Sequence, residues 1–96
     1  MTTKKISNAR SYVAKSNENA TIPAYGNRLI STGLALEIAP GYSVEVTAAP
    51  IVGSGLFTVE KQILDSSVTM ELIVRVHNHS DKPLTIHRSR QLASVL

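Results

Sequence analysis

The stretch QILDSSVTMELIVRVHNHSD, residues 62–81, decides the fold because it holds the longest alternation of apolar and polar side chains in the sequence. One face of an extended strand would carry Val68, Met70, Leu72, Val74 and Val76, and the other Thr69, Glu71, Ile73, Arg75 and His77. A period of two is the signature of a β-strand with one buried face. Asp65 precedes the strand, at the mouth of what we interpret as a β-hairpin, and a carboxylate there raises the question of a general base.

The same period continues along the rest of the sequence. One face of residues 27–38 holds Leu34, Leu36 and Ile38, and one face of residues 42–47 holds Tyr42, Val44 and Val46. The motif SDKP at 80–83 predicts a tight turn, and residues 84–96 supply one or two closing strands. No segment repeats apolar residues at helical spacing, so we predict an all-β barrel or sandwich.

The first twenty residues are polar and basic. They carry Lys4, Lys5, Arg10 and Lys15 against the single acidic residue Glu18. We therefore expect an extended interaction arm over residues 1–20 and a β-barrel domain over residues 21–96. Because a polar terminus is ordered only where something holds it, we expect the arm to pack on a neighbour or on another chain.

Composition limits the class of protein. The chain has 96 residues, which is one small domain, and no cysteine, which excludes disulfides and thiolate chemistry. The net charge is +3, but the aromatic residues are too few and scattered for a base-stacking platform, so we do not expect nucleic-acid binding. No apolar run is long enough for a membrane span, and the N-terminus lacks the apolar segment of a secretory signal.

Three stretches of the sequence resemble the dUTPase family. STGLALEIAPGYSVEV (31–46) is similar to a family segment in which a Thr-Gly-Leu strand precedes Pro-Gly and an aromatic residue. QILDSSVTMELIVRVHN (62–78) is similar to the third motif, and LTIHRSRQLASVL (84–96) to the fourth. The resemblance implies a small jelly-roll-like β-barrel that assembles as a homotrimer. It also implies hydrolysis of dUTP with magnesium and a water-activating Asp.

The residues at the third and second motif positions do not complete that site. Asp65 stands where the resemblance places the water-activating Asp. Val68 stands where the family has the tyrosine beneath deoxyribose, and Met70 where it has the glycine that lets uracil enter. The second motif's phosphate-contacting Arg-Ser corresponds to Ala49-Pro50, which cannot neutralise a phosphate.

The remaining motifs depart from the family as well. Arg10 and Tyr12 replace the key residues of the first motif, and Gln91 and Ser94 stand where the fourth motif has Arg and Gln. No Gly-rich fifth motif is in the sequence. Because catalytic groups of this kind act as a unit, we expect no dUTPase activity, no catalytic or nucleotide-binding residues and no cofactor.

The three histidines form a separate candidate. His77 and His79 are two residues apart on one strand and share a face, and His87 is placed for a neighbouring strand. Imidazoles on one face can bind zinc, but we expect solvated or hydrogen-bonded histidines rather than a metal site. If this face lines the axis of a trimer, assembly would be sensitive to pH.

We therefore expect a non-catalytic structural or interaction protein on a dUTPase-like trimeric scaffold. Its setting would be a phage virion, where a capsid decoration or cement protein stabilises the shell and contacts a capsid shell protein. The alternative is a pseudoenzyme, a binding module that sequesters a nucleotide or docks on a regulatory protein. Residual dUTP hydrolysis ranks last. The location would be the virion for a viral protein and otherwise the cytoplasm.

Overall fold

The computed structural model of the chain describes residues 2–6, 12–48, 57–65 and 71–95. These residues form only strands: β1 (Thr2–Ile6), β2 (Tyr12–Lys15), β3 (Ala20–Ile22), β4 (Asn27–Ile38), β5 (Ser43–Ala48), β6 (Phe57–Val59), β7 (Gln62–Asp65), β8 (Glu71–Asn78), β9 (Leu84–Ile86) and β10 (Gln91–Val95). The all-β prediction is confirmed. No helix in the described ranges is long and apolar enough to cross a membrane.

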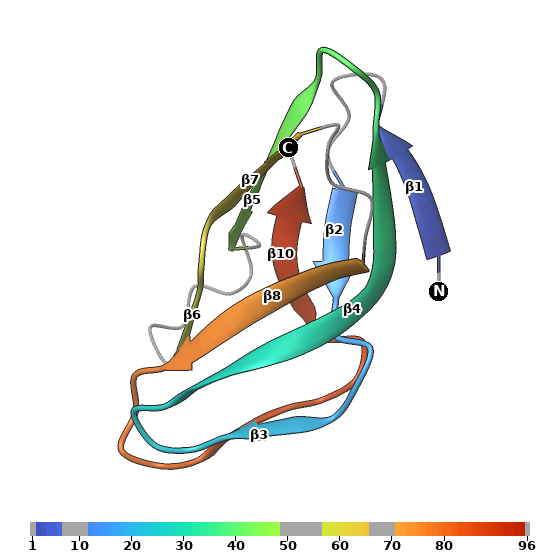
Figure 1. The fold of residues 1–96 in the computed structure, drawn as a ribbon. Helices are drawn as coiled ribbons and strands as arrows, with labels where there is room; N and C mark the ends of the chain where they lie inside the picture. The colour runs from blue at the N-terminus through green and yellow to red at the C-terminus, as the bar shows by residue number, and fades with distance from the viewer. Residues whose placement is uncertain (1, 7–11, 49–56, 66–70, 96) are drawn as a thin grey trace.

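The strands assemble into three sheets (Figure 1). The first sheet has the order β1-β4-β8-β6, and the second has the order β2-β10-β5-β7. The short β3-β9 pair lies across the lower end of the molecule in Figure 1. Most pairs are antiparallel, whereas β1 runs parallel to β4. Long-range pairing of this kind joins segments that are far apart in the sequence.

The core lies between the two larger sheets, and the predicted alternation explains which side chains enter it. Its buried apolar residues are Ala14, Ala20, Ile22, Ile30, Leu34, Leu36, Ile38, Val44, Val46, Phe57, Val59, Leu72, Val74, Val76, Ile86, Leu92, Ala93 and Val95. The predicted inner faces of β4 and β8 are therefore confirmed, while Val68 and Met70 lie outside the described residues. Burial of these side chains is the main source of stability.

Two sequence expectations were wrong. Tyr42 does not face the core with Val44, because Gly41 has a φ of 86° and the Tyr42 N–H donates to Ala39 O in a turn that precedes β5. The stretch 62–81 is not a simple hairpin either. β7 pairs with β5, and β8 pairs with β4 and β6, so the two halves of the stretch belong to different sheets.

The connection from β6 to β7 passes between those sheets. Its backbone is held by the Glu60 N–H, which donates to Arg75 O at 2.9 Å. The Gln62 amide then donates to Ile73 O, also at 2.9 Å. Both contacts reach β8, so β7 stays close to the first sheet while pairing in the second.

The expected arm is partly inside the fold. Lys4 and Lys5 lie on β1, which pairs with β4. Lys15 ends β2, whose Ala14 is only 2% exposed, and residues 12–20 contribute strands to two sheets. Arg10 lies outside the described residues. The division into an arm of residues 1–20 and a domain of residues 21–96 stays a prediction, but β2 is a structural part of the second sheet.

A bulge in β4 lies directly against Asn17, in the connection between β2 and β3. Pairing with β8 shifts register between Ser31 and Ala35, and Gly33 within the bulge has a φ of 65°. A Cβ on Gly33 would lie 2.9 Å from the Asn17 side chain. Glycine is needed here for both reasons, since an L-residue is strained at this φ and a side chain would collide.

Asn78 fixes the opposite end of β8. Its side chain is 1% exposed, and its Nδ2 donates to the carbonyl oxygens of Ile22, Pro23 and Lys82 at 3.2, 3.1 and 2.8 Å. Its Oδ1 accepts from the backbone N–H and the hydroxyl of Ser80, both at 2.9 Å. One buried amide therefore joins the β3–β4 turn to the β8–β9 turn, and the predicted turn at 80–83 is confirmed.

Candidate functional site

Asp65 is an exposed residue at the end of β7. In the pairing of β7 with β5 it stands opposite Ser43, and Ile63 stands opposite Glu45. Directly paired residues lie on the same face of an antiparallel sheet, so these four side chains share the outer face. Ile63 is 71% exposed. The residues at 49–50, 68 and 70 that would complete the family site lie outside the described residues.

The fourth-motif positions lie elsewhere on the second sheet. Ser94 of β10 is 9% exposed and stands between Thr47 of β5 and Val13 of β2. Asp65 pairs with Ser43 at the other end of β5, four residues from Thr47. At 3.3 Å per residue that is about 13 Å along the strand. Within one chain, the Ser94 hydroxyl and the Asp65 carboxylate therefore do not contact the same atom of a ligand.

Gln91 is the other fourth-motif position. It is half-buried and stands opposite Lys15 at the irregular start of the β10–β2 pairing. Neither a neutral amide here nor the buried Ser94 hydroxyl supplies the cationic and long polar side chains that hold a triphosphate. Among the described residues of one chain, Asp65, Gln91 and Ser94 are therefore not grouped around a single point.

His77 and His79 belong to a hydrogen-bonded network on the outer face of the first sheet. Their rings stack with centroids 6.4 Å apart. His79 Nε2 is 2.8 Å from the Thr58 hydroxyl, and His77 Nε2 is 3.6 Å from Glu60 Oε2. The same Glu60 oxygen is 3.4 Å from Arg75 Nε. Each polar group in the network thus has a protein partner of complementary chemistry.

His87 is separate from this pair. It follows β9, which pairs with β3 rather than with β8. Across the described ranges, no three His, Cys, Asp or Glu side chains are placed to hold one metal ion. A role of the histidines at a trimer axis stays a prediction.

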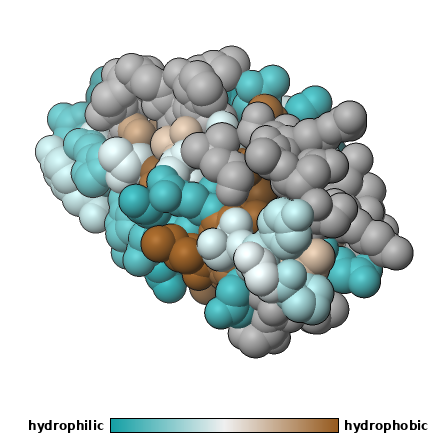
Figure 2. Space-filling view, turned by 90° about the horizontal axis from the view of Figure 1, so that it is seen from above, coloured by the Kyte–Doolittle hydropathy of each residue, from teal (hydrophilic) through white to brown (hydrophobic). Residues whose placement is uncertain are grey.

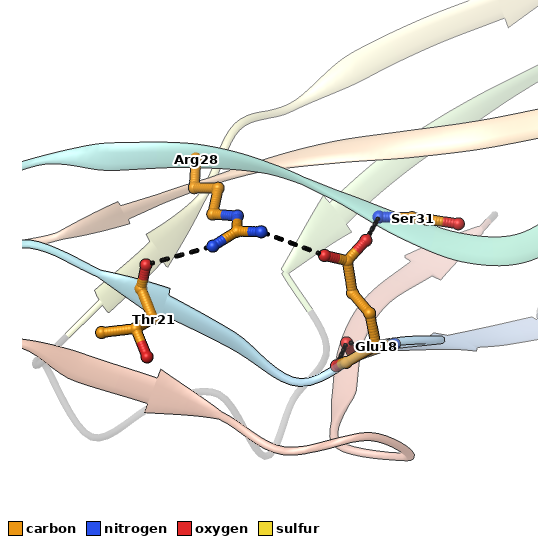
Figure 3. Close-up of polar contacts among 5 residues, drawn as sticks. Glu18, Thr21, Arg28 and Ser31 are labelled. Carbon is orange, nitrogen blue, oxygen red and sulfur yellow. Dashed lines mark hydrogen bonds and ion pairs between the residues drawn. The ribbon is translucent and has the colours of Figure 1, made fainter.

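Glu18, the acidic residue of the expected arm, holds the β2–β3 connection against β4 (Figure 3). Its Oε1 is 3.4 Å from Arg28 Nη2, and its Oε2 accepts the Ser31 N–H at 3.2 Å. Arg28 also donates to Thr21 O at 3.5 Å. The Glu18 carboxylate therefore interacts with Arg28 and Ser31 of the same chain. Sequence reasoning missed this role because the partners are contributed by a different strand.

The surface carries a few large apolar side chains outside the core. Val13, Tyr25, Leu29, Tyr42 and Ile63 are between 45% and 73% exposed. Figure 2, which views the end where β4 turns into β5, shows brown apolar groups reaching the surface among teal polar ones. The exposed residues come from different strands and turns, so alternation within one strand does not predict them.

The architecture is similar to a solved structure. That structure is a mutant of the dUTPase of Staphylococcus bacteriophage 80alpha, and the TM-score is 0.80 over 90% of this chain and 74% of that chain. The chain has a dUTPase-like fold. Sequence identity with the phage dUTPase is 14%, so the likeness concerns architecture and not the chemistry of individual side chains. No protein-family model matches the chain, and no curated protein matches it in sequence.

Proposed function

We propose that this chain is a non-catalytic interaction protein built on a dUTPase-like scaffold. The observation that carries the proposal is the retention of that fold with Gln91 and Ser94 at positions where the resemblance places Arg and Gln. Val68 and Met70 add to it, because in the sequence they stand where the resemblance places a stacking tyrosine and a glycine. A fold can be kept when the active site is lost, because fold and activity depend on different residues.

The setting we propose is a phage virion. There the protein would form a homotrimer on a three-fold position of the capsid, as a decoration or cement protein bound to a capsid shell protein. A trimer matches such a position by symmetry. Support comes from the small size of the domain, which buries a limited share of its surface and gains from assembly, and from the basic residues near the N-terminus.

The arm hypothesis needs a sharper experiment than removal of residues 1–20. Such a deletion would remove β2 and with it the buried Ala14. Lys4→Gln with Lys5→Gln removes both charges, deletes no strand and places no carboxylate opposite Glu37 in the β1–β4 pairing. We expect an intact fold that no longer joins its assembly, and unchanged assembly would reject the arm as a contact.

A second candidate is a regulatory binding module. The observation that favours it is the likeness to the phage dUTPase, because phage dUTPases control transfer of virulence genes by a proto-oncogenic G protein-like mechanism. By analogy, the present scaffold would dock on a regulatory protein or sequester a nucleotide. Residual dUTP hydrolysis ranks below both.

Nucleotide binding separates these candidates. The purified chain is heated with dUTP, dUMP or cyclic nucleotides, each with and without magnesium, and the Tm is compared with that of the chain alone. The interaction-protein proposal predicts no change, because a ligand raises the Tm only by binding the folded state. A rise of several degrees with one nucleotide would reject that proposal and favour the nucleotide-sequestering module.

A further inference from the structure

Tyr25 stands out as a strained aromatic residue on the surface. It lies in the turn between β3 and β4, is 73% exposed and has a φ of 57°. A bulky L-residue in the left-handed region is an outlier, because its Cβ crowds the backbone. The exposed ring gains little from the fold, so the strain is not balanced by burial of the side chain.

The turn that carries Tyr25 is rigid. The Gly26 N–H donates to Pro23 O at 2.9 Å, and the Tyr25 N–H donates to Ser80 O at 3.1 Å. The Asn78 backbone N–H donates to Gly26 O at 2.8 Å, in addition to the side-chain bonds of Asn78 to this turn. A rigid support lowers the entropy lost when a side chain binds a partner.

A second turn lies beside it and is held by the same amide. Ser80 and Lys82 of the β8–β9 turn bond to the Asn78 side chain, and the two turns lie side by side at the end opposite the β4–β5 turn in Figure 1. We define the twin-turn surface by its exposed residues, Pro23, Tyr25, Asp81, Lys82 and Pro83.

The geometry points to the twin-turn surface as a docking site for a partner protein that receives the Tyr25 ring in an apolar pocket bearing a hydrogen-bond acceptor for the phenol. This deepens the proposed function and rests on it. Tyrosine is among the residues that dominate protein interfaces, particularly on rigid supports. Backbone strain persists where the surrounding structure holds it, and it clusters at functional sites. Tyr25 differs from Ser89, which is also exposed, in presenting a large aromatic ring at such a position.

Charge and shape select the class of partner. Asp81 and Lys82 carry opposite charges, so the twin-turn surface has no net charge to attract the phosphates of nucleic acid or an anionic membrane. One aromatic ring does not form a platform for successive bases. A projecting ring between two rigid turns instead fits a concave protein surface of mixed polarity.

The strain argument is tested on the free protein with two glycine variants. Ser89 has a φ of 73° and is the matched control, since it also is a non-glycine residue in the left-handed region. Both Tyr25→Gly and Ser89→Gly should raise the Tm, by roughly 4 °C for a domain of this size. A fall in Tm for Tyr25→Gly would show that the ring supports the fold and would overturn the proposal.

Binding is tested with a displayed library of single-domain binders selected on the wild-type chain. We expect most independent binders to lose at least about tenfold in affinity for Tyr25→Gly and to bind Ser89→Gly as the wild type. Tyr25→Phe should lose less, because it keeps the ring. Binders indifferent to Tyr25→Gly would overturn the proposal.

Self-association is measured on the same variants by sedimentation. An oligomer that dissociates in Tyr25→Gly would identify a second copy as the occupant and would overturn the assignment to a different protein. These outcomes do not depend on nucleotide binding. A nucleotide that stabilises the chain would favour the nucleotide-sequestering module over the interaction protein, and the effect of Tyr25→Gly on binder affinity could still be interpreted.

Discussion

Asn78, at the end of β8, is 1% exposed and bonds to three carbonyl oxygens, whereas Asp65, at the end of β7, is exposed on the outer face of the second sheet. Both belong to the stretch 62–81, and both stand at positions that the dUTPase resemblance identifies. Asn78 is held by contacts that the fold itself needs. Asp65 stands at a position whose purpose in the family depends on other side chains. The difference separates residues that keep a scaffold from residues that serve a reaction.

The largest loss of stability should come from removing the Asn78 side chain at the end of β8. Asn78→Ala removes the donor to Ile22 O, Pro23 O and Lys82 O, and the acceptor for Ser80. Leaving several buried groups unpaired should cost about 3 kcal/mol in the free energy of unfolding, measured by urea titration. Ser80→Ala is the control and should cost about 1 kcal/mol. Equal, small effects would show that the amide is not the link between the turns.

Substitutions of two glycines compare the middle of β4, where Gly33 lies, with the β4–β5 turn near Asp65, where Gly41 lies. Gly33 and Gly41 both have positive φ, but only Gly33 has a neighbour within 4 Å of an added Cβ, the Asn17 side chain. We expect Gly33→Ala to cost about 2 kcal/mol and Gly41→Ala about 1 kcal/mol, from strain alone. The difference should vanish in an Asn17→Ala background. A difference that persists there would assign the excess to the backbone instead of the contact.

The Glu18–Arg28 pair should contribute least. Its side chains are 35% and 46% exposed, so solvent screens the charges. A double-mutant cycle with Glu18→Ala and Arg28→Ala should give a coupling of about 0.5 kcal/mol that decreases at high salt. Glu18→Ala alone should cost more than Arg28→Ala, because it also removes the acceptor for the Ser31 N–H. Coupling that does not change with salt would contradict the ion-pair account.

The sequence predicts the strands whose side chains alternate regularly. It does not predict which strand pairs with which when the two are far apart in the sequence. The inner face of β8 follows from the period of its side chains, since alternate residues must face one side. The hairpin interpretation failed because β7 finds its partner in β5. The sequence did not predict β2, because it lies in a polar segment and only Ala14 among its four residues is buried.

The sequence was sufficient to predict which residues stand at the motif positions of the candidate site. It was not sufficient to predict which of those residues lie near one another. Asp65, Gln91 and Ser94 could be identified from motifs, but their separation across β5 and β10 required the pairing register. The role of Glu18 depends on Ser31 and Arg28, which lie on another strand. The strain at Tyr25 has no signature in composition, because it is a property of one backbone angle.

The most direct test of the central claim is turnover of dUTP by the wild-type chain and by Asp65→Asn, with magnesium present and pyrophosphate release as the readout. The account predicts the same background rate for both proteins, because Gln91 and Ser94 stand where the family has the Arg and Gln of the fourth motif, and catalytic groups of this kind act as a unit. Turnover by the wild type that Asp65→Asn abolishes would contradict it, and would identify the exposed end of β7 as a working active site.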